Sequence, residues 1–294
     1  MLVYEEQDSG WFTHLHESSS GRFCVIAGGD HETSEQRLID LANPEAPPRL
    51  VAAREEGVQY SIADRGDELF ILTNADDAID FKVMTAPLAS PARANWRDLI
   101  PHREGIYVLD VELYAGHMVR LERANALPAI IIRDLNTGEE HAIAFDEAAY
   151  SLDTMGGYEF ETTNLRFSYS SMTTPSEVYD YDMADRTRLL RKRQEIPSGH
   201  DPADYVTTRI MATSHDGAKV PVSILHRKDL VRDGTRAAIA VRLRLLRHGD
   251  AGLVRGQPAV AGRSRFRLCD RAYPRRRRQG LGLVSRRQAR EEDQ

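Results

Sequence analysis

The sequence has little of what stabilises secreted proteins or carries a protein through a membrane. Its 294 residues include only two cysteines, Cys24 and Cys269, far apart in the chain. They exclude a disulfide framework, and we expect a reducing, cytoplasmic compartment. No apolar run approaches the roughly 18 residues of a membrane helix. The start, Met-Leu-Val-Tyr-Glu-Glu, lacks the basic and apolar regions of a signal peptide, so no membrane contact is expected.

Short motifs of common catalytic and metal sites are also missing. The nucleophile elbow G-x-S-x-G does not occur, and residues 262–264 (Gly-Arg-Ser) lack its closing glycine. His16 and His31 each precede a glutamate but have no second histidine four residues on, which excludes the zinc-helix motif. Residues 28–30 (Gly-Gly-Asp) lack the lysine of a phosphate loop and are interpreted as a turn. We therefore predict no catalytic, cofactor-binding or metal-ligating residue.

Short alternating strands, in contrast, are abundant. Leu165, Phe167 and Tyr169 alternate with polar residues, which is typical of a strand with one buried face. Residues 173–176 (Thr-Thr-Pro-Ser) predict a turn. A returning strand then carries Tyr179 and Tyr181 as core or rim residues, and residues 182–187 are expected to close the hairpin. Further strands are predicted over residues 2–15, 23–27, 36–41, 57–63, 68–73, 81–86, 106–113, 117–124, 129–135 and 141–145.

These strands form about four units of roughly 40 to 50 residues, a spacing that fits the four-stranded blades of a β-propeller. Spacing alone also permits a β-sandwich. The composition of residues 197–202 then predicts a linker. His200 and Asp201 lie in it side by side, and we interpret the histidine as a polar linker residue rather than part of a catalytic dyad. A second hairpin is predicted around residues 215–217 (His-Asp-Gly).

Three stretches of the sequence resemble the prolyl oligopeptidase family of serine peptidases, and most of all its oligopeptidase B branch. They are L-R-F-S-Y-S-S-M-T-T-P-S-E-V-Y-D-Y-D from Leu165, R-K-R-Q-E-I-P-S-G-H-D-P-A-D-Y from Arg191 and S-H-D-G-A-K-V-P-V-S-I-L-H-R-K-D from Ser214. The resemblance runs from Met1 to about Arg236. It implies a family fold in which a seven-bladed β-propeller caps an α/β-hydrolase domain with a Ser, Asp and His triad, and a family reaction that cleaves short peptides after Lys or Arg.

The resemblance predicts an all-β fold with three parts. Residues 1–196 are expected to form part of the propeller, about four blades, truncated at the N-terminus. Residues 197–236 would be the linker and the β-hairpin that starts the α/β-hydrolase domain. Residues 237–294 fall outside the family pattern. Since the family's triad lies beyond this point, we expect a truncated peptidase that is inactive alone, with short peptides as the family's partners and no cofactor.

The last part differs sharply in charge from the rest. Residues 237–294 hold 15 arginines, no lysine and 5 acidic residues, a net charge of +10, whereas the preceding 236 residues hold 24 basic and 40 acidic residues, a net charge of −16. With synonymous codons chosen to fit, the codons of residues 241–250 read one base later encode Y-G-Y-G-S-Y-G-M-A, which resembles the family's next segment. We predict a frameshift near Ala237–Ala238 and a disordered tail, because such a sequence is not selected for folding.

Two alternative functions remain. The propeller could act alone as an interaction module. The arginine-rich tail, with the four consecutive arginines of residues 275–278, could contact polyanions non-specifically through phosphate neutralisation, without specific nucleic-acid binding. Residues 191–193 (Arg-Lys-Arg) are a second basic group, interpreted as a solvated strand end or an interdomain contact.

Overall fold

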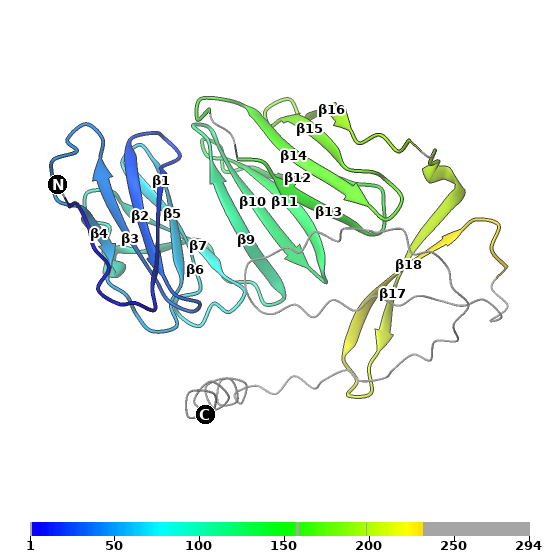
Figure 1. The fold of residues 1–294 in the computed structure, drawn as a ribbon, viewed down its shortest axis with the longest axis horizontal. Coiled ribbons are helices and arrows are strands. Elements are labelled where there is room, and N and C mark those ends of the chain that lie inside the picture. Colours follow the sequence, from blue (N-terminus) through cyan, green and yellow to red (C-terminus); the bar gives the residue numbers. More distant parts are fainter. Residues whose placement is uncertain (1, 157–158, 198, 232–294) are drawn as a thin grey trace, which may run out of the picture.

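The computed structural model describes residues 2–156, 159–197 and 199–231, and these residues form five antiparallel β-sheets (Figure 1). Four of the sheets have four strands each and stand side by side without closing into a ring, and the fifth is a two-stranded hairpin. The described residues contain no α-helix, only two 3₁₀ turns, η1 (Arg93–Asn95) and η2 (Pro202–Asp204). The prediction of an all-β fold with about four propeller blades is confirmed.

Each four-stranded sheet is a meander of consecutive strands. Sheet A contains β1 (Phe12–Glu17), β2 (Phe23–Gly29), β3 (Ser34–Asp40) and β4 (Arg49–Ala52), and sheet B contains β5 (Tyr60–Arg65), β6 (Glu68–Thr73), β7 (Lys82–Pro87) and β8 (Arg97–Ile100). Sheet C contains β9 (Ile106–Leu113), β10 (His117–Ala124), β11 (Leu127–Asp134) and β12 (Glu140–Ala142). Sheet D contains β13 (Tyr150–Thr154), β14 (Asn164–Ser171), β15 (Glu177–Asp182) and β16 (Thr187–Arg193), and the hairpin, sheet E, contains β17 (Tyr205–Thr213) and β18 (Lys219–Arg227).

Three hydrophobic cores lie between the four sheets, one at each junction. Val25 and Leu38 of sheet A pack with Leu69 and Ile71 of sheet B. Between sheets B and C the core includes Phe70, Val83, Val108 and Met118, and between sheets C and D it includes Ile130, Ile132, Leu165 and Phe167. Strand alternation produces this arrangement, because residues two apart on a strand point to the same face. Each inner sheet therefore buries both of its faces.

The hairpin predicted around residues 173–176 is present as β14 and β15. Leu165 lies opposite Tyr181 and Phe167 lies opposite Tyr179. Tyr181 is 5% exposed, and Tyr179 packs against the same core, so their interpretation as core or rim residues is confirmed. Residues 182–187, however, do not close this hairpin: they connect β15 to a further strand, β16.

Sequence analysis missed or misplaced strands with little apolar alternation. β4, β8 and β13 were not predicted, and β12 is Glu140–Ala142 rather than residues 141–145. The strand predicted over residues 2–15 is also wrong: β1 begins only at Phe12. β4, β8 and β12 are short edge strands of three or four residues with one face near solvent, so their sequences need not alternate.

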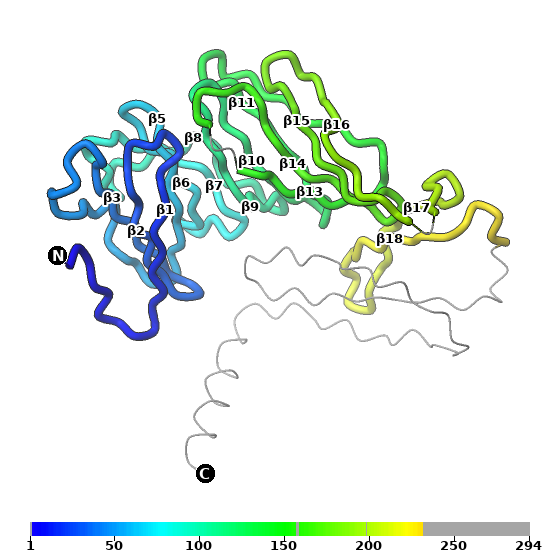
Figure 2. Tube along the Cα trace, turned by 45° about the horizontal axis from the view of Figure 1, so that its top comes forward, coloured from blue at the N-terminus to red at the C-terminus, as the bar shows by residue number. Residues whose placement is uncertain are grey.

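The hairpin of sheet E lies apart from the four stacked sheets, in yellow in Figures 1 and 2. Its turn, around residues 215–217, is where the sequence predicts it. Ile210 and Met211 are 48% and 47% exposed, which is high for apolar strand residues. The tail predicted over residues 237–294 lies outside the described residues.

Candidate functional site

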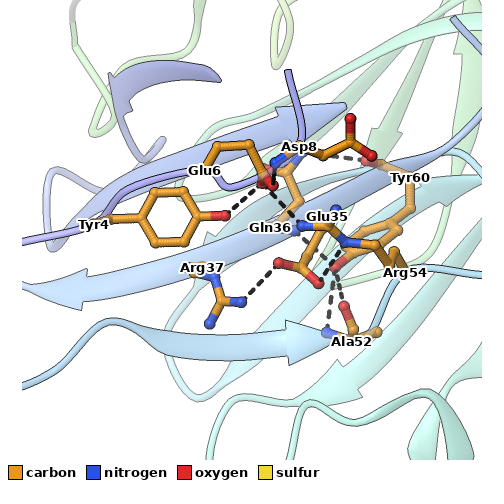
Figure 3. A network of polar contacts seen from close by, with 9 residues as sticks. All are labelled: Tyr4, Glu6, Asp8, Glu35, Gln36, Arg37, Ala52, Arg54 and Tyr60. Atoms are coloured by element: carbon orange, nitrogen blue, oxygen red, sulfur yellow. Dashed lines mark hydrogen bonds and ion pairs between the residues drawn. The ribbon is translucent and has the colours of Figure 1, made fainter. Parts of the chain in front are cut away.

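Residues 2–11, the N-terminal segment, are held against sheet A by a polar network (Figure 3). Glu6 is its centre: Tyr4 Oη donates to Glu6 Oε2 at 2.8 Å, and Arg54 Nη2 approaches the same oxygen at 2.9 Å. Arg54 also lies 3.5 Å from Glu35 of β3, and Arg37 pairs with Glu35 at 2.8 Å. The segment is therefore attached to the sheet by side chains and not by strand pairing.

Two arginine–aromatic contacts complete the attachment. The Arg54 guanidinium lies 3.7 Å from the centre of the Trp11 ring, and that of Arg37 lies 5.1 Å from the centre of the Tyr4 ring. Each contact places a cation over the negative face of an aromatic ring. The indole packs over Gly28 of β2, where a Cβ would lie 3.6 Å from the Trp11 ring, in ordinary van der Waals contact.

The concavity beside this network is polar and about 640 Å³ in volume. It is lined by Tyr4, Glu5, Glu6, Gln7, Asp8, Ser9, Arg37 and Arg54. The pKa of Glu6 is lowered to about 2, first because the backbone N–H of Asp8 donates to it and then because of Arg54. A carboxylate with so low a pKa is a poor general base at neutral pH. The network fits a structural clamp and not an acid–base site.

Tyr60 of β5 in sheet B reaches across to sheet A beside the same network and forms hydrogen bonds there. Its side chain is 5% exposed, its hydroxyl donates to Ala52 O at 2.8 Å, and it accepts from the backbone N–H of Gln36 at 2.8 Å. Burial raises the pKa of this phenol to about 12. The hydroxyl is thus a satisfied buried group that holds β3 and β4 together.

A buried ionic network lies in sheet C. Arg120 is 1% exposed and donates through Nη1 and Nη2 to both oxygens of Glu140 at 2.9 Å, and through Nε to Glu122 at 2.8 Å. Arg103 pairs with Glu122 and Arg133 with Glu140. The Arg120 guanidinium is the main reason why the pKa of Glu140 falls to about 2. Every charge of the network has a partner, as burial requires.

Acidic side chains gather on the first strands of sheets C and D. Burial raises the pKa of Asp110 and Glu112 on β9 and of Asp153 on β13, and Asp110 raises that of Glu112 further. Tyr114 Oη donates to Glu112 at 3.1 Å, and Thr154 of β13 also bonds to it. Paired carboxyl groups can serve acid–base chemistry, but here Glu112 is tied into the junction between two sheets.

His200 and Asp201 do not form a dyad. The Nε2 atom of His200 lies 2.6 Å from Thr173 O, in the loop between β14 and β15. The Asp201 carboxylate instead accepts from the backbone N–H of Ala203 and caps η2. The structure thus agrees with a polar linker residue, and adds a contact that joins the linker to sheet D.

The other residues singled out in the sequence have structural roles. Gly28 and Gly29 end β2, where they pair with Glu35 and Ser34, so the turn predicted over residues 28–30 begins only at Asp30, whose carboxylate accepts from the backbone N–H groups of Glu32 and Thr33. Arg191 and Arg193 end the exposed strand β16, where they pair with Asp180 and Glu177. This agrees with a solvated strand end, and the alternative role as an interdomain contact stays a prediction.

Within the described ranges, no three His, Cys, Asp or Glu side chains are grouped so that they could hold a metal ion. None of the helical turns in this part of the chain is long and apolar enough to span a membrane. The residues that sequence analysis missed are the charged networks around Glu6 and Arg120. Their only sequence signal is the alternation of Arg and Glu on neighbouring strands.

The family model of the prolyl oligopeptidase N-terminal β-propeller domain matches residues 1–194. The chain belongs to the prolyl oligopeptidase family. The resemblance stated from Leu165 onward is thereby confirmed, and the four stacked sheets are four blades of a family propeller.

Curated relatives extend beyond the propeller. Dipeptidyl aminopeptidase BI of Pseudoxanthomonas mexicana is 38% identical to this chain. The match covers 79% of this chain and 32% of the dipeptidyl aminopeptidase. Protease 2 of Moraxella lacunata is 24% identical over 79% of the chain and 33% of its own length. The chain therefore spans about a third of the curated relatives it matches.

Solved structures of oligopeptidase B share the fold. The enzyme from Trypanosoma brucei, in a closed form with covalently bound antipain, has a TM-score of 0.71 at 28% identity. The superposition covers 78% of this chain and 34% of the trypanosomal chain. The enzyme from Leishmania major has a TM-score of 0.72 at 27% identity, covering 79% and 34%.

Proposed function

We propose that this chain is the propeller part of an oligopeptidase B-like serine peptidase, whose family reaction is hydrolysis of short peptides after Lys or Arg, and that the chain alone is inactive. The match of residues 1–194 to the family propeller is the observation that carries the proposal. Relatives named as peptidases and the antipain-bound structural neighbour support the substrate class. No cofactor is proposed.

The proposal assigns a role to each part of the chain. Residues 1–196 form the partial propeller, and residues 197–236 are the linker and first strands of a hydrolase domain. Residues 237–294 are a frameshifted tail that contributes no catalytic group. Acyl transfer by a serine peptidase requires a nucleophile, a base and an orienting acid, and the sequence contains no G-x-S-x-G word to supply the first. The two cysteines favour a cytoplasmic location.

Peptide hydrolysis by the isolated chain is expected to be undetectable. Loss of one triad member already lowers the rate by several orders of magnitude, and here all three are proposed to be missing. An arginyl-aminomethylcoumarin peptide is incubated with the purified chain, and fluorescence is compared with buffer. Turnover that a serine-directed phosphonate blocks would refute the proposed inactivity; turnover that the phosphonate leaves unchanged would identify a contaminating hydrolase.

A second candidate is a free-standing interaction module. It is favoured by the three complete cores between sheets A, B, C and D, which give this part of the chain the interior of an independent domain. Exposed apolar side chains on sheet E and on the edge strands offer contact surface. A polyanion contact by the arginine-rich tail remains a prediction, since that part lies outside the described residues.

A further inference from the structure

Two histidines, separated by one residue, lie on the edge strand of the first blade. His14 and His16 lie on β1, which pairs only with β2 and leaves its other edge open (Figure 2). They are two residues apart, so both side chains project from the same face of the strand. Their register partners on β2, Ala27 and Val25, share that face. Both histidines are exposed along a strand that is exposed throughout.

These two rings combine exposure with the lack of a hydrogen-bond partner in the described chain, whereas His117, whose Nδ1 also has no partner, is buried. His102 accepts from Asp80 N, His141 contacts Tyr181 Oη, and His200 contacts Thr173 O. His215 and His226 also have polar partners, His31 has an interaction, and His117 is 8% exposed inside the sheet. His14 and His16 are thus accessible rings whose nitrogen atoms are not committed to the fold.

The strand spacing suits a chelate. Residues i and i+2 of a strand are about 6 to 7 Å apart along the chain, and a metal bound by two imidazoles lies about 2.0 to 2.1 Å from each nitrogen. Two rings that lean toward each other across this gap can share one ion. Backbone pairing with β2 fixes both Cα atoms in advance, so the ion orders only the side-chain torsions.

We propose that His14 and His16 form a two-nitrogen site for a borderline divalent ion of the Zn²⁺ or Ni²⁺ class, with water at the remaining positions. Neutral imidazole suits Zn²⁺, Ni²⁺ and Cu²⁺, whereas Mg²⁺ and Ca²⁺ prefer oxygen. The site is open because only two protein ligands are present, in agreement with the lack of any three-residue cluster in the described ranges.

The protonation state favours binding near neutral pH. Because a metal ligand has to be deprotonated, protons compete with the ion for the two rings, and binding should be tighter at pH 7.5 than at acidic pH.

Calorimetric titration of the full chain with NiCl₂ at pH 7.5 tests the site. We expect the wild-type chain to bind one Ni²⁺ at pH 7.5 and none at pH 5, where protons compete for the imidazoles. His14→Gln and His16→Gln should each bind Ni²⁺ at least about tenfold more weakly at pH 7.5, because the chelate is lost. His226→Gln, on the exposed hairpin, is the matched control and should bind as the wild type does.

Proton NMR of the histidine rings identifies the ligands directly. Substoichiometric Ni²⁺, which is paramagnetic, should broaden the ring signals of His14 and His16 before any others. Equal affinity of the wild type and His14→Gln, or first broadening of a different pair of rings, would show that the proposal is wrong. Circular dichroism of each variant checks that the sheets are intact, and the broadening experiment needs no variant at all.

Discussion

Replacing Phe167 by alanine is expected to lower the free energy of unfolding by about 3 to 5 kcal/mol, the usual effect of removing a buried aromatic side chain. Phe167 is fully buried between sheets C and D. Its ring meets Phe145 edge-on at 5.8 Å and stacks on Tyr179 at 5.5 Å. The substitution therefore removes the centre of an aromatic cluster and leaves a cavity at the junction of two blades. Urea unfolding followed by tyrosine and tryptophan fluorescence measures the loss.

Leu189→Ala on β16 is the matched control. Leu189 is 57% exposed, so its loss should change the free energy by no more than about 0.5 kcal/mol. Similar losses for the two variants would show that sheets C and D do not share a core. The shape of the curve is informative as well: a single cooperative transition supports a free-standing module, since all four sheets then unfold together.

Glu140→Ala is expected to cost about 3 kcal/mol, and more than Arg120→Met. Removing Glu140 takes away two of the hydrogen bonds of Arg120, a guanidinium that is 1% exposed, and leaves part of a buried charge uncompensated. Arg120→Met instead replaces the buried cation by an apolar side chain of similar length. Glu122 then keeps Arg103, and Glu140 keeps Arg133. The opposite order of the two losses in urea unfolding would contradict this account of the network.

The same network predicts that the free energy of unfolding falls at acidic pH. The pKa of Glu140 is about 2 in the folded chain, against an ordinary value of 4.5. A lowered carboxyl pKa adds stability that is present above pH 4.5 and is lost as the pH falls from about 4.5 toward 2. Glu140→Gln should show a smaller change in unfolding free energy across this window than the wild type. An identical pH profile for both proteins would rule out the contribution of Glu140.

The sequence predicts the interior of the propeller well, because buried strands require strict alternation. Leu165, Phe167 and Tyr169 show this: their spacing alone places them on one face, and the structure buries all three. Edge strands such as Arg49–Ala52 and Arg97–Ile100 are harder to predict. One side of each strand is open, so their sequences do not require regular alternation of apolar and polar residues. The number of blades was available from spacing, but the choice of a propeller over a sandwich came from the family resemblance.

The polar sites were less accessible to sequence reasoning. The clamp between Glu6 and Arg54 joins residues 48 positions apart, and no local pattern marks such a pair. The histidine pair on β1 was missed for a different reason: a metal site was sought at helical spacing, four residues apart, whereas His14 and His16 have the two-residue spacing of a strand. A search for His-x-His within predicted strands would have found it.

The nucleotide sequence around codon 237 and about 1,000 bases onward, roughly the length that encodes a hydrolase domain of the usual size, tests the central claim most directly. The claim is that this family member leaves its peptidase sequence before the catalytic residues. We predict that reading one base later from this point gives Y-G-Y-G-S-Y-G-M-A at codons 241–250 and, further on, a G-x-S-x-G word. A second frame that encodes no peptidase segment, with the present frame intact in related genes, would contradict the claim.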